Sequence, residues 1–372
     1  MNKKLEDKQE KKLNKKTRDS NIELLRIIAM LLIIIHHIVI HTNIYLYIGE
    51  NHFASLVLLT GGKIAVIIYI LIMGYYSKKS KFNISRPINI IIKVVVYSIL
   101  FMIIFNKNNF LNIKEYKQYW FINTWLILFM LEPIIKICER EIPTKIQKMI
   151  FMWITIFFLV PIRRISDIEA FIYIYLCGRH ILPKFVKIFD KQILNIFAII
   201  VLYLALIAFN LGLRPYTTII PLVTSMIIFT LFANLKIKSN IINEIAKHTI
   251  GVYLIHDNQY VRNRIIAKKL NIVNIFYTQY FLIGTIGISI IIFIICTILD
   301  YIVSKIIENS VFKIKKLNEI ILKINNKVNK YIDNNGDKNE KEKDFINNIY
   351  IYNSAFNDNN KTNKRLRRNM EL

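Results

Sequence analysis

The first apolar stretch of the chain carries side chains that could bind an anion and move a proton. Residues 21–41 read NIELLRIIAMLLIIIHHIVIH, a run with few polar interruptions. A helix of that length crosses the roughly 30 Å of bilayer hydrocarbon. The ionisable side chains within it are Glu23, Arg26, His36, His37 and His41. Because such groups are costly at membrane depth, they indicate a functional site that faces a bundle interior or a watery cavity.

The spacing of these residues places most of them on one face of a helix. Arg26 and His37 are eleven positions apart, which is three turns plus about 20°, or roughly 16 Å along the axis. Glu23 lies within about 40° of the same stripe, and His41 follows His37 by one turn. His36 is turned about 100° away from His37. One face would thus carry a cation near its start and an imidazole deeper in the membrane.

Other interpretations of this stripe stay open at the level of sequence. The polar side chains could simply satisfy one another, with Glu23 and Arg26 as an ion pair one turn apart. His37 and His41 are spaced like two zinc-binding histidines on a helix. Because no matching cysteine or His–Glu pair stands close by in the sequence, we predict no metal site.

The composition is typical of a membrane protein. Hydrophobic residues make up 54% of the 372 positions, and the mean hydropathy is +0.38. The formal net charge is +26. Nucleic acid is one partner for such a charge, but many basic residues flank apolar spans, where they hold the cytoplasmic side against anionic lipid. We therefore predict membrane lipid and no nucleic acid as a partner. Cys138, Cys177 and Cys296 form no CxxC pattern, which argues against a disulfide framework.

The fold class predicted is all-α: a polytopic membrane protein of about ten transmembrane helices. Residues 1–18 are a basic cytoplasmic arm without apolar periodicity, and 19–303 hold the transmembrane domain. Residues 304–332 are a basic amphipathic helix on the inner leaflet, or alternatively a short coiled coil, and 333–372 are a disordered polar tail. The expected spans are 21–41, 56–76, 88–105, 119–138, 149–162, 168–182, 193–211, 216–235, 245–261 and 275–303.

Ten spans between two basic ends place the protein in the cell membrane with both termini in the cytoplasm. The ninth expected span carries a second polar cluster, His256 beside Asp257, with Asn258 and Arg262 following. This cluster predicts a polar wall of a binding pocket near the outer surface. A hydrogen-bonded histidine with a purely structural role is the alternative.

At these residues the chain resembles acyltransferase family 3, bacterial membrane enzymes that O-acylate cell-surface carbohydrates. The stretch from Arg18 to His41 resembles the first helix of the family, with its arginine–ten residues–histidine motif on Arg26 and His37. TIGVYLIHDN, residues 249–258, is similar to the signature of the ninth helix. Further similar stretches are 61–76, 119–133 and 171–181. The chain departs from the family pattern at Ala65 and Met73, where small glycine and serine are usual, and Arg86 lacks a paired arginine.

The resemblance implies an O-acetyltransferase that moves an acyl group from cytoplasmic acetyl-CoA to a sugar hydroxyl of an envelope polysaccharide or a lipid-linked precursor. Acetyl-CoA would be a donor substrate, with no tightly bound cofactor. Arg26, with Arg86 and Tyr75 as further candidates, would contact this donor. His37 would act as general base or as the site of an acyl intermediate, and the sequence does not separate the two.

Glu23, His36, His256 and Asp257 would support the two catalytic residues by orienting their neighbours. A protein of another class remains open at this stage. In a glycan or small-molecule transporter, or a flippase, Arg26 and His37 would bind substrate or relay protons. Transporters often show internal repeats with helices broken at matching positions, and the sequence shows neither clearly. A membrane sensor or scaffold that uses the basic tail is a third alternative.

Overall fold

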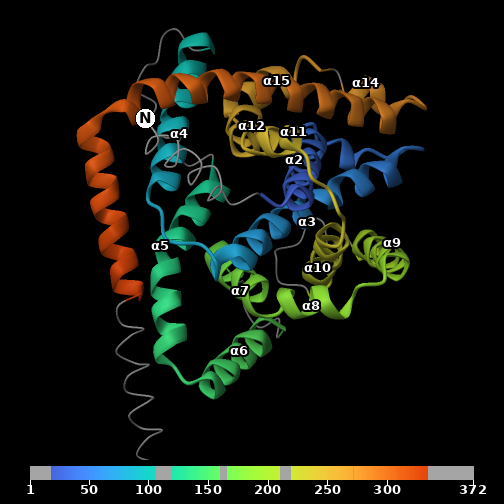
Figure 1. Cartoon of the computed structure of the whole chain (residues 1–372). Coiled ribbons are helices and arrows are strands. Elements are labelled where there is room, and N and C mark those ends of the chain that lie inside the picture. Colours follow the sequence, from blue (N-terminus) through green and yellow to red (C-terminus); the bar gives the residue numbers. More distant parts are fainter. Residues whose placement is uncertain (1–17, 106–118, 160–165, 210–218, 271, 334–372) are drawn as a thin grey trace, which may run out of the picture.

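The protein is built from helices throughout the part that the structure describes. The computed structural model describes residues 18–105, 119–159, 166–209, 219–270 and 272–333. The expected basic arm and polar tail therefore lie outside the described residues, apart from Arg18 and Asp333. Every regular element in these ranges is a helix, as Figure 1 shows. The predicted all-α class is confirmed.

Five helices in the described part are long and apolar enough to cross a membrane, and the bent pair α8–α9 makes a sixth if it is one span, with 119° between its halves. A polytopic membrane protein is thereby confirmed. The five long helices are α2 (Ser20–His41), α3 (His52–Ser77), α4 (Ser85–Phe105), α5 (Trp120–Glu141) and α15 (Phe281–Ser310). The bent pair consists of α8 (Leu182–Ile188) and α9 (Gln192–Ala208).

The other expected spans coincide with shorter helices. The fifth, sixth and eighth correspond to α6 (Thr144–Leu159), α7 (Asp167–His180) and α10 (Ile219–Ala233). Single turns or short helices connect the rest: η1 (Ile44–Leu46), the π-helical turn η3 (Arg262–Ile266), α14 (Ile272–Phe276) and η4 (Val311–Lys313).

The ninth expected span is not one helix, and the prediction of a continuous helix over 245–261 is wrong. The chain forms α11 (Asn240–Ala246), α12 (Thr249–His256) and α13 (Gln259–Val261) instead. The second break falls at Asn258, whose backbone is extended and whose side chain accepts a hydrogen bond from the Tyr260 N–H. An asparagine side chain offers the backbone an alternative to the helical hydrogen bond, and so it favours this interruption.

Helices α2 and α3 form the centre of the bundle. The apolar part of α3 is 72% buried, against 22% for α15, most of whose isoleucines face outward, where lipid would surround them. Helix α7 packs on α3 at backbone distance through two glycines. A Cβ on Gly74 would lie 2.2 Å from the Tyr175 carbonyl oxygen, and one on Gly178 would lie 2.5 Å from that of Leu71. Small residues that allow such approach are typical of helix contacts within membranes.

A buried carboxylate joins α15 to α4 and α12. Both Asp300 oxygens lie 2.8 Å from the Lys93 ammonium, and the Tyr97 hydroxyl donates to Asp300 at 2.6 Å. The His248 Nδ1, at the start of α12, lies 2.7 Å from the other oxygen. Gly251 has no room for a side chain, because its Cβ would lie 1.9 Å from the carboxylate. This Asp300 cluster therefore sets where α12 begins.

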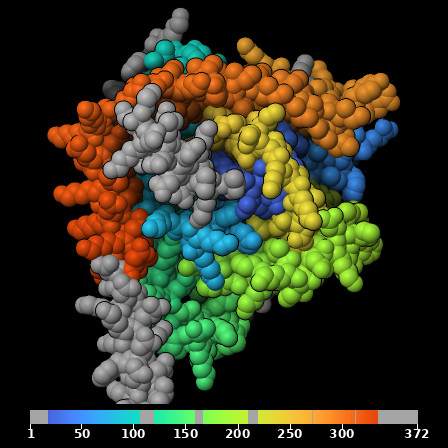
Figure 2. Space-filling model, viewed as in Figure 1, coloured from blue at the N-terminus to red at the C-terminus, as the bar shows by residue number. Residues whose placement is uncertain are grey.

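A helix over residues 315–333 follows α15, within the expected amphipathic segment. It lies beside α5 in Figure 1 and along one edge of the molecule in Figure 2. Asn325 and Asn329 bond the backbone N–H groups of Ile84 and Phe82 at 2.8 and 2.9 Å. Arg140 at the end of α5 donates to the Ile332 carbonyl. The helix is thus attached to the transmembrane domain, and α15 itself runs to Ser310, past the expected boundary at 303.

We predict that Asp300→Ala lowers the stability of the protein by about 3–5 kcal/mol, because it leaves the Lys93 ammonium buried without a partner. Lys93→Met should cost less, because Asp300 keeps its bonds to Tyr97 and His248. Ser304→Ala is the matched control, since its hydroxyl lies 3.2 Å from the same carboxylate but carries no charge.

Unfolding can be followed on heating by the reaction of buried thiols with a fluorescent reagent. Cys177 and Cys296 are buried, and the exposed Cys138 would first be replaced by serine. A melting temperature of Asp300→Ala equal to that of the parent would contradict the assignment of Asp300 as a structural tether.

Candidate active site

The deeper imidazole of α2 meets the end of α12. The Nδ1 of His37 lies 3.0 Å from the Nε2 of His256, and 3.5 Å from the Oδ1 of Asp257. His256 is fully buried and Asp257 is 3% exposed. The break after α12 makes this contact possible, because it ends the helix at His256 and places Asp257 directly beyond it. The structure thus brings together three of the predicted site residues.

A backbone carbonyl sets the tautomers of this histidine pair when both rings are neutral. The Nδ1–H of His256 donates to the Val252 carbonyl at 2.7 Å, so the Nε2 of His256 is an acceptor. The Nδ1 of His37, 3.0 Å away, must then be the donor. The remaining nitrogen of His37, Nε2, is left without a proton, since the bond at one ring nitrogen decides the state of the other. His37 is thereby prepared to accept a proton at Nε2.

Asp257 places a carboxylate where a protonated His37 would need it. Its Oδ1 also lies 3.5 Å from the Nε2 of His41 and 3.4 Å from the Nη1 of Arg262. A charge buried at this depth requires partners of opposite sign. Asp257 therefore stabilises positive charge on His37 or His41 of α2, and Arg262 of η3 supplies a further cation.

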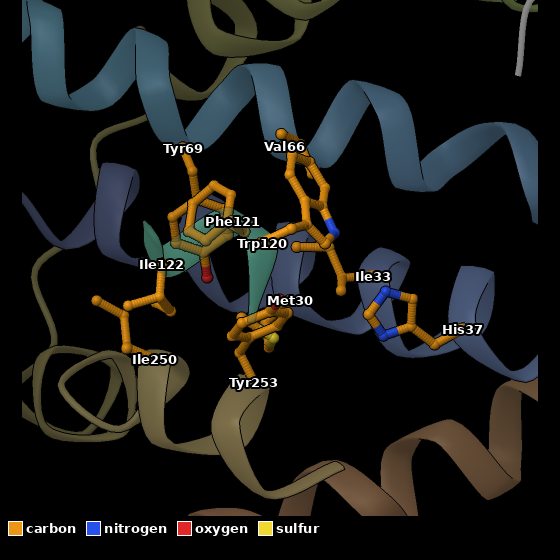
Figure 3. Close-up of a pocket in the computed structure, with 10 residues that line it drawn as sticks. All are labelled: Met30, Ile33, His37, Val66, Tyr69, Trp120, Phe121, Ile122, Ile250 and Tyr253. Atoms are coloured by element: carbon orange, nitrogen blue, oxygen red, sulfur yellow. The ribbon is translucent and has the colours of Figure 1, made fainter. Parts of the chain in front are cut away.

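His37 lines a narrow apolar cavity between four helices. Figure 3 shows its ring at one side of this cavity, with one nitrogen toward α12 and the other toward Val66 of α3. The remaining lining is aliphatic and aromatic, with the Tyr69 hydroxyl as a polar group. The lining residues are Met30, Ile33 and His37 of α2, Val66 and Tyr69 of α3, Trp120, Phe121 and Ile122 of α5, and Ile250 and Tyr253 of α12.

Arg26 lies one turn before the first lining residue of α2. Its guanidinium pairs with Glu23 at 3.3 Å, and about a third of the side chain is exposed. The hydroxyl of Tyr69, which lines the cavity, donates to the Arg26 carbonyl at 2.9 Å. The stripe of Arg26, Met30, Ile33 and His37 therefore runs along one side of the cavity, with the cation before it and the imidazole at its far end.

His36 serves the packing of α2 on α3. Its Nδ1 lies 2.6 Å from the Leu59 carbonyl oxygen. The ring covers Gly62 so closely that a Cβ there would lie 2.3 Å from the His36 ring. Within the described ranges no hydrogen bond joins His36 to His37. The His36 side chain therefore packs against α3. This geometry does not support the expectation that His36 orients a catalytic neighbour.

The two further donor-binding candidates are not brought to the cavity. Tyr75 packs on Phe229 and Tyr76, with ring centroids 4.9 and 5.2 Å apart. Arg86 is exposed in the first turn of α4. Neither residue lines the cavity.

Tyr119 contributes to the site although the sequence did not single it out. Asn258, part of the second polar cluster, donates to the Tyr119 hydroxyl at 3.0 Å, and this hydroxyl donates to the Leu254 carbonyl at 2.8 Å. These bonds hold the break after α12 against the start of α5. No sequence spacing connects Tyr119 with Asn258. His41, by contrast, was already placed on the stripe by its spacing, one turn after His37.

The fold and the site define a class: a multi-pass membrane protein with a buried histidine–carboxylate centre beside an apolar cavity and a cation at the near end of the same helix face. Comparison with protein families identifies the chain further. Residues 19–304 match the acyltransferase domain of acyltransferase family 3, and the chain belongs to this family. The resemblance seen in the sequence is thereby confirmed, and the protein is a membrane acyltransferase. Neither the curated proteins nor the solved structures gave a significant match.

Proposed function

We propose that the protein moves an acyl group, in the first place acetyl, from cytoplasmic acyl-CoA to a hydroxyl group of an envelope carbohydrate. The observation that carries this proposal is the position of His37. Its Nδ1 is engaged by His256 at 3.0 Å, and the ring borders an apolar cavity. A base fixed in one tautomer beside a dry cavity is suited to take the proton of an attacking hydroxyl.

On the donor side, the apolar cavity and Arg26 match the two parts of CoA. CoA has a polyanionic end and a thin pantetheine arm that ends in the thioester. The arm would lie along the apolar wall of Met30 and Ile33, with the thioester at His37. Arg26 would contact a phosphate or the near part of the arm, since a guanidinium binds phosphate oxygens in a planar fork. The basic arm 1–18 precedes α2 and puts this end on the cytoplasmic side, where acyl-CoA is found.

The reaction is a single acyl transfer in which His37 carries the proton. The acceptor oxygen attacks the thioester carbonyl, and the Nε2 of His37 takes the hydroxyl proton. The tetrahedral intermediate then releases the CoA thiolate as the C–S bond breaks, and the imidazolium returns the proton to sulfur. Asp257, 3.5 Å from the Nδ1 of His37, stabilises the imidazolium between these steps. Positioned acid–base catalysis of this kind contributes about 10²–10⁴-fold.

The acceptor would approach from the opposite end of α2, near His41 and η1. Both termini are proposed to lie in the cytoplasm, so this end faces outward. The family similarity favours a carbohydrate acceptor and argues against the alternative function of a glycan or small-molecule transporter. Purified protein in lipid, supplied with labelled acetyl-CoA and envelope glycan, tests the proposal directly. Failure of the wild type to transfer label to any envelope glycan would reject it.

We predict that His37→Ala loses transfer by about 10²–10⁴-fold while the protein still inserts, because the variant lacks the proton acceptor. His36→Ala is the matched control on the next residue. It loses the bond to the Leu59 carbonyl, so transfer should fall much less once activity is normalised to folded protein. Transfer at the wild-type rate in His37→Ala would remove this residue from the mechanism.

His256 should act on the turnover number through His37. In His256→Leu the Nδ1–H of His37 loses its acceptor at 3.0 Å and keeps only the Asp257 oxygen at 3.5 Å. The tautomer of His37 is then held less firmly, and kcat should fall about tenfold, the equivalent of one hydrogen bond. The KM for acetyl-CoA should stay unchanged. His256→Gln can present an amide oxygen to the same N–H and should recover part of kcat. An equal loss in both variants would show that His256 is needed only for packing.

Arg26→Ala should raise the KM for acetyl-CoA about 10–100-fold, because a charge-assisted hydrogen bond is lost. Arg26→Lys should recover only part, since an ammonium does not reproduce the planar fork. Arg18→Ala is the control: this arginine lies 3.7 Å from the same Glu23 carboxylate. If Arg26→Ala changes neither KM nor CoA inhibition while Arg18→Ala does, the donor contact belongs to Arg18 instead.

A further inference from the structure

Three groups at the outer end of α2 lie close enough to share one metal ion. The Nδ1 of His37, the Nε2 of His41 and an oxygen of Asp257 all lie within 4.8 Å of one another. Each histidine nitrogen is 3.5 Å from the same Asp257 oxygen. In a tetrahedral zinc site with bonds of about 2.0–2.1 Å, ligand atoms are about 3.3–3.4 Å apart. Two of the three separations therefore already have nearly the length that coordination requires.

The chemical state of these groups also suits a metal. The Nε2 of His41 is shielded from solvent and faces the Asp257 oxygen at 3.5 Å. The Nε2 of His256 carries a lone pair, because the Nδ1–H of the same ring donates to the Val252 carbonyl. This lone pair accepts from the Nδ1–H of His37 at 3.0 Å and is released when that nitrogen gives up its proton. A metal-bound histidine usually donates its other N–H to such a carbonyl. A set of imidazoles with one carboxylate favours Zn²⁺ or a similar transition-metal ion.

We propose that His37, His41 and Asp257 form a reversible Zn²⁺ site that inhibits the transferase. The inhibition rests on the proposed role of His37 as proton acceptor. When Zn²⁺ binds Nδ1, the proton of the neutral ring must move to Nε2. This nitrogen then donates instead of accepting, and it takes no proton from an acceptor hydroxyl. One ion at the far side of the ring thus switches off the base without filling the donor cavity.

Because Arg262 lies beside Asp257, we expect Zn²⁺ to bind this site reversibly and not as a permanently bound ion. The Nη1 of Arg262 lies 3.4 Å from the shared Asp257 oxygen and competes with a bound cation for it. About a quarter of the side chain of Arg262 and of His41 is exposed. Arg262 can therefore turn toward solvent, and an ion can reach the site past His41. The sequence alone gave no third ligand, because Asp257 comes from the distant α12–α13 break.

The test measures metal binding separately from turnover. Protein without a histidine tag and with Cys138→Ser is titrated with Co²⁺ in lipid nanodiscs, since the visible spectrum of Co²⁺ reports its coordination. We expect one equivalent of low-coordinate Co²⁺, displaced by Zn²⁺, and inhibition of acetyl-CoA turnover over the same Zn²⁺ range. His41→Gln should weaken both binding and inhibition at least about tenfold, as the loss of a ligand does.

His52→Gln is the matched control, because His52 stands at the start of α3 with its Nδ1 2.9 Å from the Tyr47 carbonyl and outside the three-ligand set. It should bind Co²⁺ like the wild type. Absence of stoichiometric Co²⁺ binding by the wild type would overturn the proposal, and so would unchanged affinity in both His41→Gln and Asp257→Asn. Because Co²⁺ binding is read without turnover, a metal-free wild type that transfers no acetyl group would count against the proposed function and not against the site.

Discussion

The contact between α2 and the C-terminal end of α12 is the interaction on which the site depends. A polar group in the membrane interior must find a partner inside the protein. His37 finds two, His256 at 3.0 Å and Asp257 at 3.5 Å. Both come from a place where the helix ends, so the chain can present two successive polar side chains to the same neighbour. A continuous helix would have turned Asp257 about 100° away from His256.

The rest of the bundle keeps this contact in place. Asp300 holds His248, the residue directly before α12, by a hydrogen bond. Gly251 lets α12 pack directly against the Asp300 carboxylate. Asn258 and Tyr119 hold the other end. Helix α12 is therefore fixed at both ends by buried polar bonds, while its middle borders the cavity through Ile250 and Tyr253. Such short helices have little stability of their own and depend on tertiary contacts.

The polar residues of the site stand at different heights along α2. Arg26 and Glu23 stand at one end of the stripe and His41 at the other, with the apolar residues Met30 and Ile33 before His37. The arrangement suits a reaction whose donor and acceptor come from opposite sides, because both would meet at one imidazole. Helix α3 completes the wall and reaches α2 closely at Gly62, where His36 takes the place of a missing side chain.

The sequence by itself determined the helical class, the long apolar spans and the stripe of Arg26 and His37, because all of these follow from the 3.6-residue period and from local hydrophobicity. It also pointed to His256 and Asp257 by their similarity to a family signature.

Only the tertiary structure decided which groups meet. The partners of His37 come from more than two hundred residues away, and the Asp300 cluster joins α4, α12 and α15. His36 and His37 are neighbours in sequence, yet in the packed bundle His36 contacts α3 and His37 lines the cavity. Tyr75 and Arg86 carry suitable chemistry, but their helices direct them elsewhere. Local patterns set the face of a helix, whereas the choice of what that face contacts is a property of the packed bundle.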